Sequence, residues 1–168
     1  PDGDEAKKLS YCEDFWENLL RENVTRKSLI IAVGGGAVLD FAGFCASVFM
    51  RGIPCIYVPT TLLSMVDGSE GGKTGINLYG TKNVIGTFTE PAAIMRNVDF
   101  LQTLNECEIL SGWAEVIKHA LLNGGTLMEL IQKGSPEVND AESWMEIIRE
   151  NILFKKEIVS EDFKEKGL

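Results

Sequence analysis

Three ionisable side chains in one short segment could act together in one functional site. In the segment GWAEVIKHALL, Glu115, Lys118 and His119 lie three and four residues apart, so a helix would place them on one face. The spacing of Glu115 and His119 is compatible with joint coordination of a metal ion. Two simpler interpretations stay open: Glu115 and Lys118 can form a helical ion pair, and His119, the one histidine of the chain, can be an ordinary core or surface residue.

A second candidate site is the glycine-rich segment GGGAVLD at residues 34–40, which follows the apolar run SLIIAV. A strand that passes through glycines into a helix presents unpaired backbone N–H groups, and a backbone without Cβ atoms lets a pyrophosphate approach the positive end of the helix. This arrangement suits a dinucleotide. The alternative is that the glycines only permit a tight turn, and their spacing differs from G-x-G-x-x-G.

A third candidate lies at residues 66–88, VDGSEGGKTGINLYGTKNVIGTF, where glycines surround Lys73, Lys82 and Asn83. The segment has almost no helical or alternating apolar period, so we expect a flexible loop. Two ammonium groups and an amide on such a loop could enclose a phosphate. The alternative is a pair of solvated surface lysines.

The elements that must position these residues alternate between helix and strand in the first part of the chain. We expect helices over about residues 4–23 and 37–49 and buried strands at 28–33, 54–58 and 92–95. Alternation of this kind predicts a parallel sheet. After about residue 105 the strand signals stop, and three helices are expected, over 105–125, 126–134 and 141–163.

Composition limits the classes of protein to be considered. The 168 residues are 45% hydrophobic and 24% charged, which is typical of one or two globular domains. No apolar run of about 18 residues and no signal-peptide pattern occurs, so a soluble, cytoplasmic protein without membrane association is expected. The net charge of −9 disfavours nucleic-acid binding. Four scattered cysteines are expected to be reduced and mostly buried.

Taken together, the segments resemble the 3-dehydroquinate synthase family of the shikimate pathway. The resemblance covers essentially the whole chain and rests on GGGAVLDFAGF, MRGIPCIYVPTTLLSMVDGSEGGKTGIN, GTKNVIGTF and GWAEVIKHALL, in that order. It implies an α/β fold in which a parallel-sheet, Rossmann-like NAD-binding domain, residues 1–104, precedes the start of an α-helical metal and substrate domain, residues 105–168. It also implies that a first strand and the end of the helical domain lie outside this chain.

The resemblance assigns roles to individual residues by motif. NAD-binding positions would be Asp2, Gly3, Asp4, Glu5, Ala6, Lys7, Gly36, Ala37, Val38, Leu39, Asp40, Thr60, Thr61, Lys73, Lys82, Phe100, Leu101, Gln102 and Thr103. Substrate-site and catalytic positions would be Asp67, Lys73, Asn83, Lys118, Lys155 and Arg51, the last reaching a phosphate across a homodimer interface. Glu115 would be the carboxylate ligand of a zinc or cobalt ion, whereas His119 is not a ligand in the family.

The activity implied is elimination of phosphate from a phosphorylated seven-carbon keto acid, followed by cyclisation. In the family, bound NAD transiently oxidises a ring hydroxyl that the metal polarises, phosphate leaves, the hydride returns, and ring opening precedes aldol closure. Another sugar-phosphate cyclase, a metal-dependent polyol dehydrogenase and a non-catalytic nucleotide-binding relative are the alternatives. The lysines of GGKTG and TKN favour a substrate that bears phosphate.

Several positions depart from the family pattern. Leu39 stands where glycine is usual, Glu70 where a small residue is usual, and Phe163 in place of an acidic residue. The two metal-binding histidines of the family would begin just after Leu168. We therefore expect this chain to be a central fragment of a longer protein, inactive alone because Glu115 and His119 leave a third metal ligand to be found.

Overall fold

The computed structural model describes residues 3–163, which form two compact units. The first unit comprises Pro1–Pro59 and Gly72–Met95, and the second comprises Thr60–Gly71 and Arg96–Leu168. Each unit is described separately below. The predicted boundary between residues 104 and 105 lies where the strand signals stop, and it stays a prediction.

The first unit is built on a short parallel sheet, as predicted. Its strands are β1 (Ile30–Gly34), β2 (Cys55–Pro59) and β5 (Ala93–Ile94), in the order β1-β2-β5. Ile30 is paired with Cys55 and Ile56 with Ala93, both in parallel register. Apolar runs that end in glycine or proline explain β1 and β2, and the predicted α/β class is confirmed. The expectation that the strands at 28–33 and 92–95 are buried is wrong, because Ile31 and Val33 of β1 are 60% and 54% exposed and Met95 after β5 is 61% exposed.

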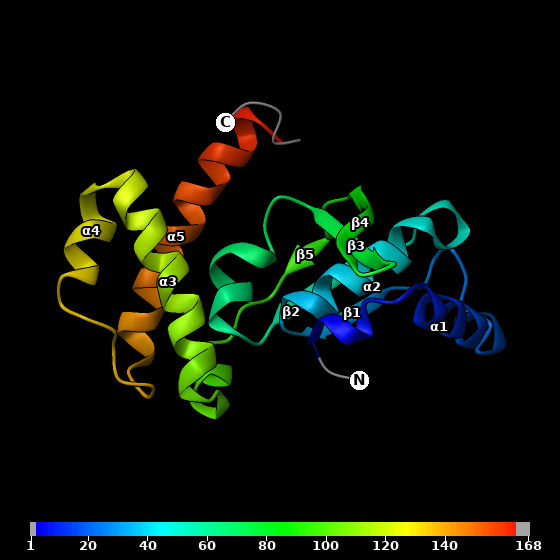
Figure 1. Ribbon diagram of the computed structural model, residues 1–168, viewed down its shortest axis with the longest axis horizontal. Helices are drawn as coiled ribbons and strands as arrows, with labels where there is room; N and C mark the ends of the chain where they lie inside the picture. Colours follow the sequence, from blue (N-terminus) through cyan, green and yellow to red (C-terminus); the bar gives the residue numbers. More distant parts are fainter. Residues whose placement is uncertain (1–2, 164–168) are drawn as a thin grey trace. The chain divides into compact units, whose positions relative to one another are not determined.

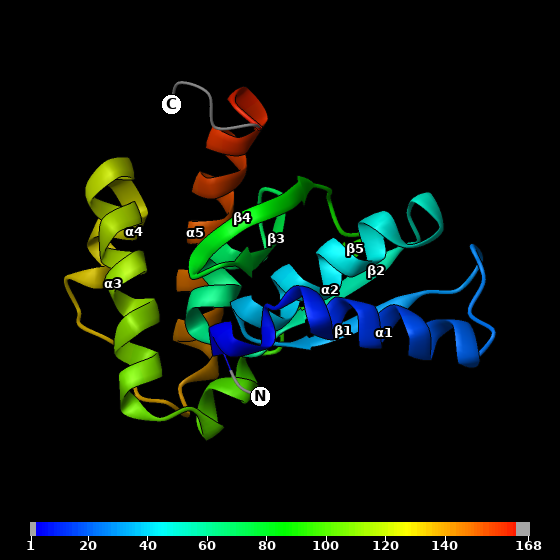
Figure 2. The same ribbon diagram turned by 45° about the vertical axis from the view of Figure 1, so that its right-hand side comes forward.

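Two helices and two shorter turns accompany this sheet. They are η1 (Gly3–Ala6), α1 (Leu9–Arg21), α2 (Gly36–Val48) and η2 (Phe49–Arg51). Small residues let α2 approach its neighbours closely: a Cβ atom on Gly43 would lie 2.0 Å from the hydroxyl oxygen of Tyr57. Helix α2 packs against β1 and β2 and also against β3 (Lys73–Leu78) (Figures 1 and 2).

The prediction of a flexible loop at residues 66–88 is wrong. Most of this segment is an antiparallel hairpin of β3 and β4 (Thr81–Phe88). Its glycines interrupt the alternation of apolar side chains that would have indicated strands. They are needed because the two backbones lie close together: a Cβ atom on Gly86 would lie 2.0 Å from the carbonyl oxygen of Thr74. The hydroxyl of Thr74 also lies 2.7 Å from that of Thr87 on the facing strand.

The second unit is helical, and the three predicted helices are confirmed. It contains η3 (Ser64–Gly68), η4 (Val98–Thr103), α3 (Glu106–Asn123), α4 (Gly125–Ile131) and α5 (Ala141–Glu161). Helix α3 packs on α4, and α5 contacts both (Figure 1). The Asn105 side chain caps α3 by accepting a hydrogen bond from the Glu108 N–H, and Gly124 closes the helix at φ 69°.

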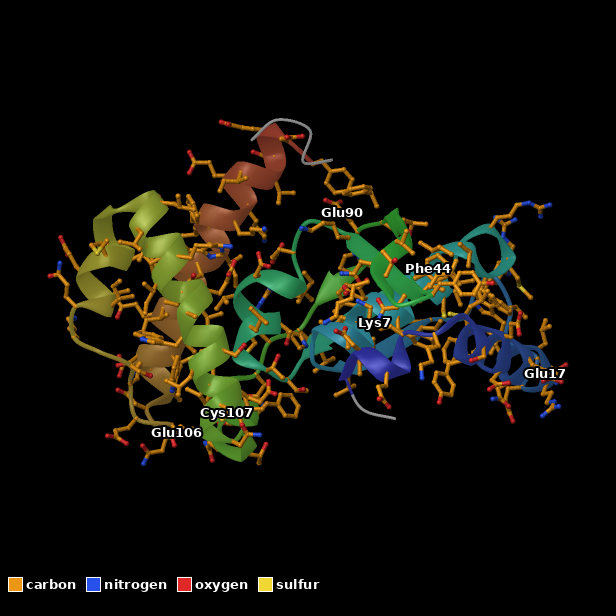
Figure 3. The ribbon with its side chains drawn as sticks, in the orientation of Figure 1. Lys7, Glu17, Phe44, Glu90, Glu106 and Cys107 are labelled. Atoms are coloured by element: carbon orange, nitrogen blue, oxygen red, sulfur yellow. The ribbon has the colours of Figure 1, made fainter. Side chains whose placement is uncertain are left out.

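The core of the second unit holds its elements in fixed positions. Trp144 is buried and lies edge-on to Trp113, with ring centroids 5.9 Å apart. A Cβ atom on Gly112 would lie 2.5 Å from the Cβ atom of Leu62, so only glycine lets α3 approach the segment that begins η3. Glu106 and Cys107, labelled in Figure 3, lie at the exposed start of α3.

Among the residues described, no helix combines the length and apolar character needed to cross a membrane. Cys12, Cys45 and Cys55 are buried free thiols and Cys107 is an exposed one, as expected for reduced, mostly buried cysteines.

Candidate functional site

The second unit brings three of its elements together around a cluster of charged side chains. Asp67 comes from η3, a five-residue π-helical turn, a geometry frequent at functional sites. Glu115, Lys118 and His119 share one face of α3, as their spacing predicts, and Lys155 comes from α5. The Nε2 atom of His119 lies 3.1 Å from Glu115 Oε1 and 4.0 Å from Asp67 Oδ1.

Two ammonium groups oppose the two carboxylates of this cluster. Lys155 Nζ lies 2.7 Å from Asp67 Oδ1, and Lys118 is paired with Glu115. Burial raises the pKa of Asp67, but Lys155, assisted by His119 and Lys118, outweighs burial and holds this pKa below 3.8. The aspartate is therefore ionised at neutral pH.

A buried asparagine fixes the orientation of the imidazole. The Asn151 amide nitrogen donates to the carbonyl oxygen of Ile147 at 2.7 Å, and its Oδ1 atom lies 3.0 Å from His119 Nδ1. The ring of Phe154 packs edge-on against the imidazole at 5.4 Å. Sequence reasoning missed Asn151, although a lone amide within the apolar face of a helix is a usable signal of a buried polar contact.

The donors of this cluster fit a divalent metal ion. One ligand atom each from Asp67, Glu115 and His119 lies within 4.8 Å of the others. Asp67 Oδ1 is buried and lacks a hydrogen bond of good geometry among the described residues, although Lys155 lies within ion-pair distance. Imidazole nitrogen and carboxylate oxygen are donor types that zinc accepts, and three protein ligands are the usual number in a catalytic zinc site. The third donor, Asp67, was not evident from the sequence because it lies in a different segment.

In the first unit, the predicted nucleotide turn links β1 to α2. Gly35 precedes the first turn of α2, and within the part of the chain that the structure describes no side chain caps that end of the helix. A Cβ atom on Gly36 would meet nothing within 4 Å, so open space lies beside this backbone. Such a turn can accept a pyrophosphate. Of the predicted contacts, Leu39 turns its side chain into the core, whereas Val38 is partly exposed.

A buried lysine forms the polar centre of the first unit. Lys7, which follows η1, is 2% exposed and lies beside α2 (Figure 3). Its Nζ atom donates to Asp40 Oδ2 at 2.6 Å and also to the amide oxygen of Asn83. Burial raises the pKa of Asp40 above 3.8, and Lys7 only partly offsets this effect. Three residues predicted for the ligand site are thus bonded to one another.

The remaining predicted positions of the first unit are near its surface. Lys82 is paired with Asp4, both largely exposed, and Lys73 is exposed at the start of β3. Arg51 is exposed at φ 67°. Gly3, Glu5 and Ala6 belong to η1. Asp2 lies outside the described residues.

The predicted cofactor positions of the second unit occupy two short segments. Thr61 begins the turn before η3, where its hydroxyl lies 2.9 Å from the Ser64 hydroxyl, and Thr60 is half-buried beside it. Phe100, Leu101, Gln102 and Thr103 belong to η4. The Leu101 side chain is fully buried in the core, so that residue could offer a ligand only its backbone.

One departure from the family pattern has a structural explanation. Glu70 accepts a bond of 2.6 Å from Arg96, and both side chains are mostly buried. Arg96 also donates to the carbonyl oxygen of Met65 and to the hydroxyl of Ser69. The glutamate is therefore a partner that lets Arg96 tie η3 to the segment that precedes η4.

Comparison with known proteins gives consistent results for both parts of the chain. The family model for the N-terminal part of 3-dehydroquinate synthase matches residues 1–111, and the model for its C-terminal part matches residues 112–168. A curated 3-dehydroquinate synthase of Pseudarthrobacter chlorophenolicus is 44% identical over this whole chain, which covers 47% of that relative. The chain thus spans about half the length of the curated relatives it matches.

Solved structures of similar proteins carry the same fold. A 2-epi-5-epi-valiolone synthase from Streptomyces hygroscopicus with NAD⁺ and Zn²⁺ bound has a TM-score of 0.91 at 27% identity, with 99% of this chain and 48% of that one covered. A 2-deoxy-scyllo-inosose synthase in complex with carbaglucose-6-phosphate, NAD⁺ and Co²⁺ has a TM-score of 0.91 at 28% identity, with 99% and 47% covered.

Proposed function

Because the chain belongs to the 3-dehydroquinate synthase family, we propose that its protein is a phosphate-eliminating carbon–oxygen lyase that forms 3-dehydroquinate. The substrate would be a phosphorylated seven-carbon keto acid, and the cofactors NAD and a zinc or cobalt ion. The observation that carries the proposal is the convergence of Asp67, Glu115 and Lys155, from three separate elements, on one cluster. The family resemblance assigns these three residues to the metal and substrate site.

The second unit would hold the metal and the charged substrate. Glu115, assisted by Asp67 and His119, offers the donor set described above. A bound divalent ion would supply polarisation of the substrate hydroxyl that is to be oxidised. Lys118 and Lys155 stand beside the carboxylates, where their ammonium groups can bind anionic oxygens of the substrate and hold it in one orientation.

The first unit would contribute to the nucleotide site. The N–H groups at the start of α2 and the open space beside Gly36 suit a pyrophosphate. Bound NAD would supply a reversible hydride acceptor. Lys7 would hold Asp40 in place at the end of the first turn of α2. Because the Lys7 side chain is buried, Lys7 would position Asp40 rather than contact a phosphate itself.

The related structures support a substrate and cofactors of this kind. Those proteins were crystallised with NAD⁺ and with Zn²⁺ or Co²⁺, one of them beside a sugar-phosphate analogue. We further propose a homodimer in which Arg51 reaches the partner's substrate, and a cytoplasmic location. The family resemblance also gives Lys73, Lys82 and Asn83 of the hairpin roles in binding substrate and cofactor.

The test is an assay of the full gene product, because the curated relatives are about twice as long as this chain. We expect release of phosphate and formation of 3-dehydroquinate with NAD in catalytic amount, and no accumulation of NADH. Net NADH production would identify a dehydrogenase instead. A protein that binds NAD and metal without either reaction would be the non-catalytic relative.

A matched pair of variants distinguishes the effect of a lysine in the site from that of a lysine on the surface. Lys155→Met removes the ammonium group beside Asp67, and Lys156→Met removes an exposed one from the next position of α5. We expect the first to lower kcat/KM at least about a hundredfold, as for loss of a charge-assisted contact to an anion, and the second to leave it unchanged. Equal effects would contradict the assigned role of Lys155.

A further inference from the structure

We propose that Arg96 is a positioning residue of the candidate site, because its guanidinium group holds the π-helical turn η3 in place and thereby sets the position of the Asp67 carboxylate. Both residues belong to the second unit. The structural part of this inference rests on the contacts of Arg96, and its consequence for catalysis rests on the proposed function.

The guanidinium group of Arg96 binds to the chain on both sides of Asp67. Its Nε atom donates to the carbonyl oxygen of Met65 at 2.9 Å. Its Nη2 atom donates to the Ser69 hydroxyl at 2.9 Å and to Glu70 Oε1 at 2.6 Å. The side chains of Arg96 and Glu70 are 15% and 9% exposed, so solvent weakens these bonds little. One planar group thus connects the residues before and after Asp67.

The backbone of η3 needs such a partner because its hydrogen bonds are irregular. The Met65 oxygen would accept from the Ser69 N–H in an α-helix and from the Glu70 N–H in a π-helix. Here the Ser69 N–H donates to the Ser64 oxygen at 3.1 Å. The Glu70 N–H donates to the Asp67 oxygen at 2.9 Å. Met65 is buried, and a buried carbonyl without a donor is costly, so the guanidinium group supplies the donor that the turn directs elsewhere.

The position of the Asp67 carboxylate depends on this turn more than on the side chains around it. Lys155 Nζ lies 2.7 Å from Asp67 Oδ1, yet among residues 3–163 that oxygen lacks a hydrogen bond of good geometry. The Nε2 atom of His119 is farther away, at 4.0 Å. Because the side chain itself is weakly held, its position follows that of the backbone of η3. The contacts of Arg96 with η3 therefore keep Asp67 beside Lys155.

Glu70 allows the guanidinium group to be buried. A buried cation that has lost its anion is strongly destabilising, and Glu70 accepts a charge-assisted bond from the same Nη2 atom that donates to Ser69. Glu70 stands where the family pattern has a small residue. The Arg96–Glu70 pair therefore acts as one unit, and this departure from the pattern becomes part of the positioning of Asp67.

The first experiment measures the effect of Arg96 on η3 independently of activity. Arg96→Lys keeps a positive charge beside Glu70, but a single ammonium group lacks the planar fork that reaches the carbonyl and hydroxyl acceptors together. We expect hydrogen exchange of residues 64–70, measured by mass spectrometry on the full gene product, to become at least about tenfold faster. Arg149→Met removes an exposed arginine of α5 and should leave this exchange unchanged. Exchange in Arg96→Lys equal to that of wild type would overturn the proposal.

The second experiment determines whether Arg96 acts through Asp67. We expect Arg96→Lys to lower kcat/KM for phosphate release by the full gene product at least about tenfold, because small displacements of a group in the site weaken catalysis steeply. In an Asp67→Asn background the same change should have an effect of less than about twofold, since the group that Arg96 positions is already altered. Equal effects in the two backgrounds would show that Arg96 supports the fold in general and would contradict the positioning role.

The two experiments separate this inference from the proposed function. Faster exchange in Arg96→Lys, in a protein that makes no 3-dehydroquinate, would support the role of Arg96 in holding η3 and remove the function. Formation of 3-dehydroquinate, with exchange and kcat/KM unchanged by Arg96→Lys, would support the function and remove the role of Arg96.

Discussion

The two units of this chain each hold a polar cluster in which lysines are paired with carboxylates, and the clusters differ in how completely their polar atoms are hydrogen-bonded. In the first unit, the buried ammonium group of Lys7 bonds both Asp40 and Asn83. In the second, an oxygen of Asp67 lacks a well-formed hydrogen bond from any of residues 3–163, and a histidine nitrogen faces two carboxylates. A satisfied cluster fixes structure, whereas an unsatisfied one is suited to receive a ligand. This contrast leads to different expectations for variants of the two units.

The largest expected effect on stability is that of Lys7→Met. Removing the ammonium group leaves the Asp40 carboxylate, whose side chain is 24% exposed, without its cation. We expect a loss of about 3 kcal/mol in the first unit, the low end of the range for a broken buried pair. Hydrogen exchange of the α2 amides would measure it, with the exposed Lys8→Met as the control. A loss below about 1 kcal/mol would mean that the cluster does not stabilise the fold.

The next effect concerns ligand binding without loss of structure. Gly36→Val adds a side chain in open space, so the fold should persist while the pyrophosphate is blocked. We expect NAD affinity, measured by calorimetry on the full gene product, to fall at least about a hundredfold. Gly43→Ala on the same helix should instead destabilise the first unit, because its Cβ atom would clash with Tyr57. Unchanged NAD affinity in Gly36→Val would show that the turn between β1 and α2 does not bind the cofactor.

Lowering the pH should change the contributions of Asp40 and Asp67 to folding stability in opposite directions. The pKa of Asp40 lies above 3.8 because burial disfavours its charge, so acidification to that raised value protonates the folded form first and favours folding. The pKa of Asp67 lies below 3.8: burial opposes ionisation, but Lys155 outweighs it. Its contribution is present above the unfolded pKa and is lost as pH falls through the folded value. Carboxyl carbon NMR should show Asp40 titrating at higher pH than Asp67, and the opposite order would contradict the contrast.

The smallest expected effect on stability is that of Lys82→Met. The side chains of Lys82 and Asp4 are 72% and 45% exposed, so solvent screens their pairing. The change in unfolding free energy should stay within about 0.5 kcal/mol, as measured by urea denaturation. If Lys82→Met lowered the free energy of unfolding about as much as Lys7→Met does, the exposure of the two side chains would not explain their contributions to stability.

The sequence predicts much of the fold because its signals are local. Apolar runs that end in glycine or proline indicate β1 and β2, and helical spacing indicates α3 and α5. The hairpin was missed because Gly75 and Gly86 interrupt the alternation of side chains, although they are required where the strands approach closely. Strand pairing of this kind depends on the partner strand, which a local pattern does not contain.

The candidate site shows the same limit. Glu115, Lys118 and His119 were predicted to share a face because they lie on one helix. The roles of Asp67 and Asn151 beside them depend on how η3 and α5 pack against α3. Spacing along one helix therefore predicts part of a site, and the residues that complete it from other segments become visible only in the folded chain.

The central claim is that the cluster of the second unit is the metal-dependent catalytic site, and one paired measurement tests it most directly. Bound metal and phosphate release would be determined together in the full gene product for wild type, Glu115→Gln and Glu108→Gln. Both glutamates lie on α3, but only Glu115 faces Asp67 and His119. We expect Glu115→Gln to lose bound metal and at least about a thousandfold in kcat/KM together, with Glu108→Gln unchanged in both. Retention of metal and activity by Glu115→Gln would contradict the account.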